Sequence, residues 1–348
     1  MKEKLFMIVV FGALMACGGG EKKADEAAVE ETVNEFEGLA ERANSLFGVL
    51  PAEAVSATNP ITPEKVALGK KLYFDVNLSK DNTQSCNTCH NLNTFGVDNK
   101  QFSPGNDGGL GGRNSPTTLN AALHFAQFWD GREPSVEAQA GGPILNPVEM
   151  AMPSEEAVVK KLSGIDGYEE MFAAAFPGAS PAITYDNLKN AIGAFERKLI
   201  TPSKFDKFMG GDESALNDQE KKGLTTFIDA GCITCHAGAA LGGAMYQKFG
   251  VYKDYWEFTG SENIDNGRFD VTGVESDKYM FKVPSLRNVA KTGPYFHDGS
   301  VTDLRQAISI MGESQLNNKE FTGEELDAML AFLNTLTGEL PAGLAEAP

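Results

Sequence analysis

Apolar residues recur at steps of three and four in several separate stretches of the chain. One stretch begins at Thr62-Pro63, where proline suits the first position of a helix, and continues to about Phe74. Comparable patterns cover residues 154–162 and 185–199. Few segments alternate between apolar and polar residues with the period of two that a half-buried strand requires. The pattern predicts a mainly α-helical protein.

Capping residues indicate two further helices. Asn217 is followed three residues later by Glu220, and Thr322 by Glu325, which is the spacing of a capping box. The helix after Thr322 carries an apolar stripe that is most simply core, formed by Leu326, Met329, Leu330, Leu333 and Leu336. Residues 91–116 are predicted to form a long loop, because five glycines crowd positions 105–112.

The first fifty residues have the features of a leader and a tether. Lys2 and Lys4 precede an apolar run that ends at Cys17, as in a secretory signal, and the end of this segment (1–17) resembles a bacterial lipobox. We expect Cys17 to be lipidated and to anchor the protein to a membrane in the periplasm; a plain signal peptide with an incidental cysteine is the alternative. Residues 18–50 predict a flexible tether and then one amphipathic helix, which packs on the body or pairs with a copy of itself. No later stretch is apolar enough to span a bilayer.

The charge of the chain narrows the choice of partners. Its formal net charge is −18, which argues against nucleic acid as a partner. An acidic surface would steer a basic, soluble electron carrier towards the protein. Solubility alone is an equally good reason for the acidity.

The cysteines carry the strongest chemical signal. Four of the 5 Cys lie in two complete C-x-x-C-H motifs, Cys86-Asn-Thr-Cys89-His90 and Cys232-Ile-Thr-Cys235-His236. This is the attachment signature of a c-type haem, in which both thiols bond the haem and the histidine binds the iron. A zinc site would need a second Cys or His pair nearby. The sequence therefore predicts two haem domains, at 51–205 and 206–348, each with a few helices and long loops around one haem.

The second axial position of each iron decides what each haem can do. A haem closed by a strong ligand transfers electrons, whereas an open one can bind peroxide or dioxygen. Beyond the two motifs, the candidate ligands are His124, His297 and the methionines. Of these, His124 and His297 are interpreted mainly as structural, hydrogen-bonded histidines.

Several longer stretches resemble the bacterial di-haem cytochrome c peroxidase family, which is related to the di-haem enzymes that mature methylamine dehydrogenase. They occur in order from about residue 45 to 340. They are Cys86–His90, Arg113-Asn-Ser-Pro-Thr117, Gln127-Phe-Trp-Asp-Gly-Arg132, Glu149-Met150, Phe281-Lys-Val-Pro-Ser-Leu-Arg-Asn288 and Pro294-Tyr-Phe-His-Asp-Gly299.

The resemblance implies a division of labour between the haems. The N-terminal haem, held by His90, would react with peroxide. Glu149 and Gln139 match the distal-pocket residues of the family, and Trp129 matches the tryptophan between the haems. From the chemistry of the residues, Glu149 could move the proton that cleavage of the peroxide bond requires, as a general acid–base.

The resemblance also implies the second haem and a calcium ion. The C-terminal haem, held by His236 and by Met311, would store an electron. Calcium would lie between the domains, bound by the Asn114 side chain and by the carbonyls of Thr292 and Pro294.

Two positions test the resemblance. Many family members close the peroxide-reacting haem with a histidine on a mobile loop, and here Asn106 stands at that position. We therefore expect this haem to be open at rest, as in the relatives that mature methylamine dehydrogenase. Those relatives have a tyrosine where Met311 stands, so Met311 favours the peroxidase; Met245 and Met280 are its rivals as ligands.

The predicted function is reduction of hydrogen peroxide to water with electrons from a small cytochrome c or copper protein. One alternative is a di-haem oxidase that modifies a partner protein by long-range electron transfer. Another is a non-enzymatic electron shuttle, which would have no use for Glu149 over an iron. A homodimer is expected only by analogy with the family.

Overall fold

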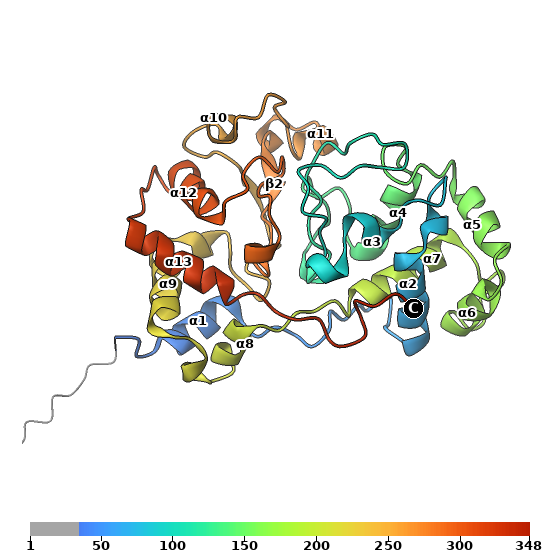
Figure 1. The fold of residues 1–348 in the computed structure, drawn as a ribbon, viewed down its shortest axis with the longest axis horizontal. Helices are drawn as coiled ribbons and strands as arrows, with labels where there is room; N and C mark the ends of the chain where they lie inside the picture. The colour runs from blue at the N-terminus through green and yellow to red at the C-terminus, as the bar shows by residue number, and fades with distance from the viewer. Residues whose placement is uncertain (1–34) are drawn as a thin grey trace, which may run out of the picture. The chain divides into compact units, whose positions relative to one another are not determined.

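Helices provide most of the regular structure in residues 35–348, the part of the chain that this computed structural model describes (Figure 1). The α-helices are α1 (Leu39–Phe47), α2 (Pro63–Phe74), α3 (Cys86–Cys89), α4 (Val136–Leu145), α5 (Glu155–Ser163), α6 (Tyr168–Ala175), α7 (Tyr185–Glu196), α8 (Lys204–Met209), α9 (Asp218–Asp229), α10 (Tyr255–Thr259), α11 (Phe269–Thr272), α12 (Leu304–Gln315) and α13 (Gly323–Asn334). The mainly helical prediction is confirmed.

Shorter elements fill the connections. Two three-residue strands, β1 (Tyr246–Lys248) and β2 (Met280–Lys282), pair antiparallel with Tyr246 opposite Lys282. The 3₁₀ turns are η1 (Val76–Leu78), η2 (Leu92–Thr94), η3 (Ala121–Leu123), η4 (Glu213–Ala215), η5 (Cys232–Thr234), η6 (Glu275–Asp277) and η7 (Val289–Lys291). Within 91–116, η2 is the one regular element, as the glycine content predicted.

The helix before the first haem motif forms as its capping signals predict. Thr62 caps α2 by accepting a hydrogen bond from the Lys65 amide at 3.2 Å, and Pro63 occupies the first turn. Helix α2 then packs against α7, with Gly69 at the contact: a Cβ there would lie 2.6 Å from the Ala191 carbonyl carbon and 2.9 Å from the Phe195 Cβ. The missing side chain lets the two helices approach closely.

The helix before the second motif repeats this arrangement. Both predicted capping boxes are present, at the starts of α9 and α13. These helices pack on each other, and a Cβ on Gly223 would lie 2.5 Å from the Ala328 carbonyl carbon and 2.9 Å from the Phe332 Cβ. The predicted apolar stripe of α13 is core, with Leu326, Met329 and Leu333 buried. In each half, the helix that precedes the haem motif thus packs closely on a helix from later in the chain, α2 on α7 and α9 on α13.

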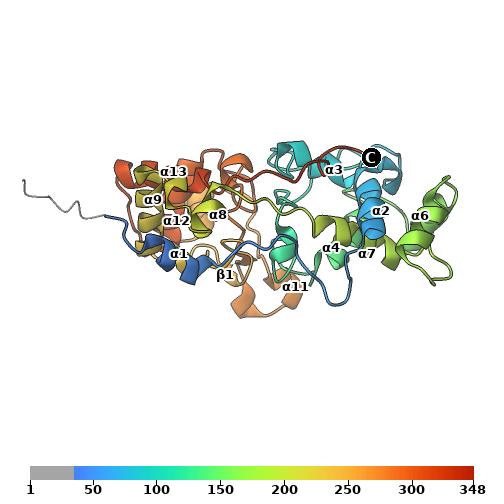
Figure 2. The ribbon, with the colours of Figure 1, turned by 90° about the horizontal axis from the view of Figure 1, so that it is seen from below.

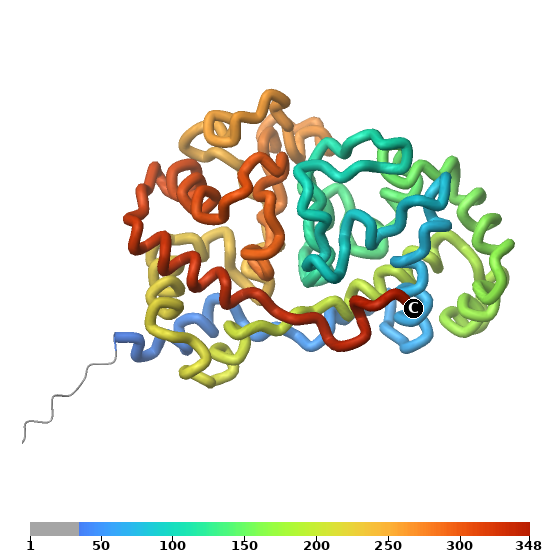
Figure 3. The backbone as a smooth tube through the Cα atoms, viewed as in Figure 1, coloured from blue at the N-terminus to red at the C-terminus, as the bar shows by residue number. Residues whose placement is uncertain are grey.

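Each end of the described chain packs on the half of the protein that is distant from it in sequence. Helix α1, within the predicted amphipathic segment, packs on the C-terminal half, with the Phe47 and Phe227 rings 6.4 Å apart. The last residues lie along α2 instead, and the Lys70 ammonium donates to the Gly343 carbonyl at 2.6 Å (Figures 2 and 3). The domain boundaries at 51, 205 and 206 stay a prediction. Cys17 and the leader lie outside the described residues. Within residues 35–348, no helix is long and apolar enough to cross a membrane.

Candidate haem sites and their surroundings

The C-terminal haem site is the second C-x-x-C-H motif, which comes after α9 through a tight turn. Gly231 has φ 90°, a left-handed conformation that turns the chain into η5. His236 is anchored by a 3.1 Å hydrogen bond between its Nδ1 and the Leu241 carbonyl oxygen. Burial lowers the pKa of His236 to about 4. The imidazole is therefore neutral, with Nδ1 protonated and Nε2 free to bind an iron.

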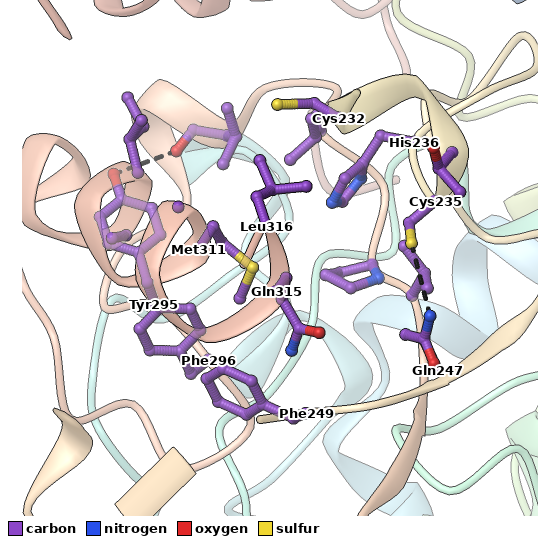
Figure 4. A pocket seen from close by; sticks show the side chains of 18 of the residues that line it. Cys232, Cys235, His236, Gln247, Phe249, Tyr295, Phe296, Met311, Gln315 and Leu316 are labelled. Carbon is purple, nitrogen blue, oxygen red and sulfur yellow. Dashed lines mark hydrogen bonds between the residues drawn. The ribbon is translucent and has the colours of Figure 1, made fainter. Parts of the chain in front are cut away.

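A cavity of about 350 Å³ opens beside this motif. Cys232, Cys235 and His236 line it together with Met311, and Figure 4 shows the Met311 side chain and the His236 ring pointing into the same space. The rest of the wall is largely apolar, formed by α12, α13 and the segment around β2. An apolar cavity with two thiols and a free imidazole nitrogen fits a c-type haem.

The cavity also discriminates among the methionines. Met311 lines it from α12, whereas neither Met245 nor Met280 does. Met329, a methionine not anticipated as a rival, lines it from α13 and is 1% exposed. The wall therefore favours Met311 over the two rivals considered from the sequence.

The N-terminal haem site is the first motif, Cys86, Cys89 and His90. A capping box between Ser85 and Thr88 starts α3, which holds both cysteines. Tyr73 of α2 donates a 2.6 Å hydrogen bond to the His90 carbonyl. Burial lowers the pKa of His90, whose ring lies beside backbone carbonyls but makes no hydrogen bond at Nδ1. A neutral imidazole next to two half-buried thiols again fits a c-type haem.

Glu149 lies close to this first motif. Its carboxylate accepts a 2.7 Å hydrogen bond from the Asn146 side chain. Burial raises the pKa of Glu149, partly offset by Asn146 and by the charge of Arg132. The pKa of Cys89 is raised mainly by burial and also by the Glu149 charge, so the carboxylate is within electrostatic reach of the motif. Gln139 lies half-buried on α4, the helix that leads into the Glu149 turn.

The Asn106 side chain, at the position of the family's distal histidine, is hydrogen-bonded to Asp81. Its side-chain oxygen accepts a hydrogen bond from the Asp81 amide at 3.1 Å, and its nitrogen donates to the Asp81 carboxylate at 2.9 Å. Its backbone amide donates to the Glu149 carbonyl at 2.6 Å. Beside it, a Cβ on Gly105 would lie 2.7 Å from the Val148 carbonyl carbon. The glycine-rich loop is thus packed on the Glu149 turn, with Asn106 fastened to residue 81.

Trp129 belongs to the N-terminal half of the sequence but lines the C-terminal cavity. Its indole nitrogen donates a 2.8 Å hydrogen bond to the Asn114 carbonyl. The Trp129 and His297 rings lie 6.3 Å apart. His297 is held by aromatic rings, including a stacked contact with Phe281 at 4.2 Å, and its buried Nε2 has no hydrogen-bond partner. Ring packing therefore positions His297, as suits the structural role expected of it, and the hydrogen bond expected of its side chain stays a prediction.

Comparison with known proteins identifies the family. Residues 63–214 match the sequence pattern of the family described as di-haem cytochrome c peroxidase. The chain is 46% identical over 292 residues to a cytochrome c551 peroxidase of Nitrosomonas europaea, which covers 84% of this chain and 85% of that protein. The chain belongs to the di-haem cytochrome c peroxidase family.

Other relatives show the breadth of the family. The methylamine utilization protein MauG of Methylorubrum extorquens is 35% identical over 297 residues, covering 82% of this chain and 81% of that protein. A crystal structure of a MauG-like protein associated with microbial copper homeostasis superposes with a TM-score of 0.77 at 30% identity, covering 86% of this chain and 97% of that one. Membership of a di-haem family implies that both C-x-x-C-H motifs carry haem.

The residues expected to bind calcium lie on neighbouring segments. Asn114 is buried, its side-chain nitrogen donates to the Lys100 carbonyl at 2.8 Å, and its backbone amide donates to the His297 carbonyl at 2.7 Å. Asn99 donates to the Gly293 carbonyl, between Thr292 and Pro294, at 2.9 Å. No group of three or more His, Cys, Asp or Glu side chains in 35–348 could hold a metal ion. A calcium ion here would depend on amide and carbonyl oxygens, which are ligands that it accepts.

Proposed function

We propose that this family member is a cytochrome c peroxidase that reduces hydrogen peroxide to water with electrons from a small redox protein. The observation that carries the proposal is the contrast between the two sites. The C-terminal cavity has Met311 and His236 pointing into it, whereas the N-terminal site has the half-buried carboxylate of Glu149 and an asparagine, Asn106, whose side chain is bonded to Asp81. The haem irons supply the redox chemistry, and the protein residues supply binding and proton transfer.

Glu149 is the general acid–base of this proposal. Its carboxylate accepts a proton from one peroxide oxygen and returns a proton to the other, so that the oxygen–oxygen bond can break heterolytically. A raised pKa suits both steps, because a proton-transfer group works best when its pKa approaches the working pH. Asn146 fixes one carboxylate oxygen, and the Gln139 amide orients the peroxide or the product water.

The remaining roles concern electrons and charge. Met311 would bind the iron of the C-terminal haem, and a methionine ligand would raise the potential of that haem. Trp129, between the Asn114 carbonyl and the C-terminal cavity, lies on the path between the haems. Calcium at Asn114, Thr292 and Pro294 would hold the segments around Trp129 together. A small cytochrome c or a copper protein would donate the electrons.

The location and assembly of the protein remain proposals from the sequence. Lipidation at Cys17 would tether the enzyme to a membrane in the periplasm, where c-type haems are attached. A homodimer is proposed by analogy with the family.

Asn106 also favours a second candidate function, the oxidation of a partner protein by long-range electron transfer. An open first haem needs no activating electron and suits either enzyme. A methionine at the second haem favours the peroxidase. Turnover with a reduced small cytochrome c separates the two, because a protein-modifying oxidase would turn over poorly with that donor.

The central test is Glu149→Gln, which keeps the side-chain shape and removes the base. We expect the second-order rate constant with peroxide to fall by about 10²- to 10⁴-fold, the usual contribution of general acid–base catalysis. Glu170→Gln, on the exposed surface of α6, is the matched control. Stopped-flow absorbance of the oxidised protein measures both. An unchanged rate in Glu149→Gln would remove Glu149 from its role.

The same assay tests the resting state of the wild type. When the oxidised, calcium-loaded protein is mixed with peroxide, we expect its spectrum to change at once. Asn106 stands at the position of the closing histidine, and its side chain is bonded to Asp81, so it would leave the first haem open. A spectrum that changes only after one electron has been added would mean that another residue closes the first haem.

A further inference from the structure

Lys282 is a buried cation without an acidic partner. It ends β2, is 6% exposed and lines the cavity of the C-terminal haem site. No carboxylate in residues 35–348 forms an ion pair with it, and its side chain has one hydrogen-bond partner there, the Nδ1 atom of His124 at 3.2 Å. Burial alone lowers the pKa of Lys282 to about 8. An ammonium in such a place is costly unless an anion joins it.

His124 accepts a hydrogen bond from this ammonium and is itself held in place by packing. The ring is pressed on Gly243, where a Cβ would lie 2.7 Å from the His124 Cγ and 3.0 Å from Nε2. Burial, and then the Lys282 charge, lower the pKa of His124, so the ring is neutral. An ammonium can only donate, so Nδ1 accepts and the proton lies on Nε2. That Nε2 is buried without a partner.

The acidic groups near this pair are already engaged. Lys282 donates its backbone amide to the Trp129 carbonyl, and the next residue, Asp130, is bound by Arg113 at 2.5 Å and by Arg132 at 2.9 Å. Tyr246, opposite Lys282 in the strand pair, accepts a 2.7 Å hydrogen bond from Arg268. The neighbouring side chains therefore offer Lys282 no free anion.

We propose that Lys282 binds a propionate carboxylate of the C-terminal haem and that His124 orients the Lys282 ammonium. The propionates are the anionic groups of a haem, and the cavity that Lys282 lines is the one with Cys232, Cys235 and His236 in its wall. A lysine has three donors, and His124 takes one, which leaves two for a carboxylate. Lys282 is a cofactor-binding residue in this proposal, and His124 is a positioning residue.

The proposal rests on haem binding and is independent of peroxidase activity. With Lys282 in place, the propionate charge is balanced. Removal of the ammonium would leave a buried carboxylate unpaired near the iron, which favours the more positively charged, oxidised state. We expect Lys282→Met to shift the reduction equilibrium of this haem at least tenfold towards the oxidised form, which is 59 mV for one electron.

The experiment compares haem-loaded wild type, Lys282→Met, Lys282→Arg and the surface control Lys253→Met. Spectroelectrochemical titration gives the midpoint potential of the haem that is reduced first, and resonance Raman spectroscopy gives its propionate bending mode, which responds to hydrogen bonding of the carboxylate. We expect Lys282→Met to lower both the potential and the mode frequency. Lys282→Arg should keep the reduction equilibrium constant within threefold of the wild-type constant but change the frequency of the propionate mode. Lys253→Met should change neither quantity.

Two outcomes would overturn the proposal. One is a propionate mode that is identical in the wild type and both Lys282 variants. The other is a midpoint potential in Lys282→Met that corresponds to a reduction equilibrium constant within threefold of the wild-type constant. If Lys282→Met fails to retain haem, the mode in Lys282→Arg decides, because that variant keeps the buried cation. Normal peroxide turnover with a shifted potential would support the proposal and leave the peroxidase function intact.

Discussion

The two closely packed glycines, Gly69 and Gly223, make a sharp prediction about stability. In an ordinary helix, Gly→Ala is stabilising by about 1 kcal/mol, because alanine has the higher helix propensity. Here, a Cβ on Gly69 would lie 2.6 Å from the Ala191 carbonyl carbon and 2.9 Å from the Phe195 Cβ. These are backbone or near-backbone atoms, so no side-chain rotation relieves the overlap, and α2 and α7 must separate.

The magnitude is set by these two opposing effects. Overpacking of a well-filled core typically costs about 1–3 kcal/mol, and a backbone overlap belongs at the upper end of that range. After subtraction of the propensity gain of about 1 kcal/mol, Gly69→Ala is expected to destabilise the protein by about 2 kcal/mol. At about 2–4 °C per kcal/mol, the midpoint of thermal unfolding falls by roughly 4–8 °C. The same loss is expected for Gly223→Ala, because its surroundings repeat those of Gly69.

The assay is thermal unfolding of the haem-loaded protein, monitored by circular dichroism. Gly164→Ala is the matched control, because Gly164 ends α5 with φ −90° and the nearest atom to an added Cβ is 3.5 Å away. That control should melt within about 2 °C of wild type, since surface substitutions away from special features stay within roughly ±0.5 kcal/mol. A Gly69→Ala protein that melts at or above the wild-type temperature would refute the packing argument.

Three further predictions concern charge and electrons. Burial would raise the pKa of Glu137, but the hydrogen bonds from Arg197 at 2.7 and 2.9 Å and from Asn59 at 3.0 Å lower it to about 2. The stability that Glu137 contributes is therefore present above pH 4.5 and is lost as the pH falls towards 2. Glu137→Gln should remove the pH dependence from this part of an acid-unfolding titration. Met311→Ala should lower the potential of the C-terminal haem in a redox titration, because a methionine ligand raises it, and an unchanged potential would exclude Met311 as the ligand. Trp129→Phe should slow electron transfer between the haems after rapid reduction, while both haem spectra stay unchanged; an unaltered rate would take Trp129 off the path.

The sequence predicted best the features that depend on local chemistry. The starts of α2, α9 and α13 depend on a capping residue and the residues just after it, and all three formed as predicted. Helix α4 was not predicted, because Gly141, Gly142 and Pro143 disfavour a helix on propensity alone. Tertiary packing explains it: α4 packs on α7 and buries Val136, Ala140 and Ile144.

The candidate sites divide in the same way. Each C-x-x-C-H motif is contiguous, so its chemistry can be recognised without a structure. The pairing of Lys282 with His124 joins residues 158 positions apart, and no local pattern announces it. His124 was interpreted as a structural, hydrogen-bonded histidine; it is hydrogen-bonded at Nδ1, but its buried Nε2 has no partner. Strands β1 and β2 were also missed, because three residues are too few to show a period of two.

The two haem sites begin from the same local plan and differ in the segments that come after each motif. In each site, a helix with a glycine at its closest contact leads into C-x-x-C-H, and a second helix crosses it with an alanine carbonyl and a phenylalanine. After the second motif, α12 brings Met311 into the cavity. After the first, the chain continues into the glycine-rich loop, which packs on the Glu149 turn. Under the proposed function, the later segments would decide which haem stores an electron and which reacts with peroxide. Exchange of residues within the shared helix pair should then change stability at both sites without exchanging their roles.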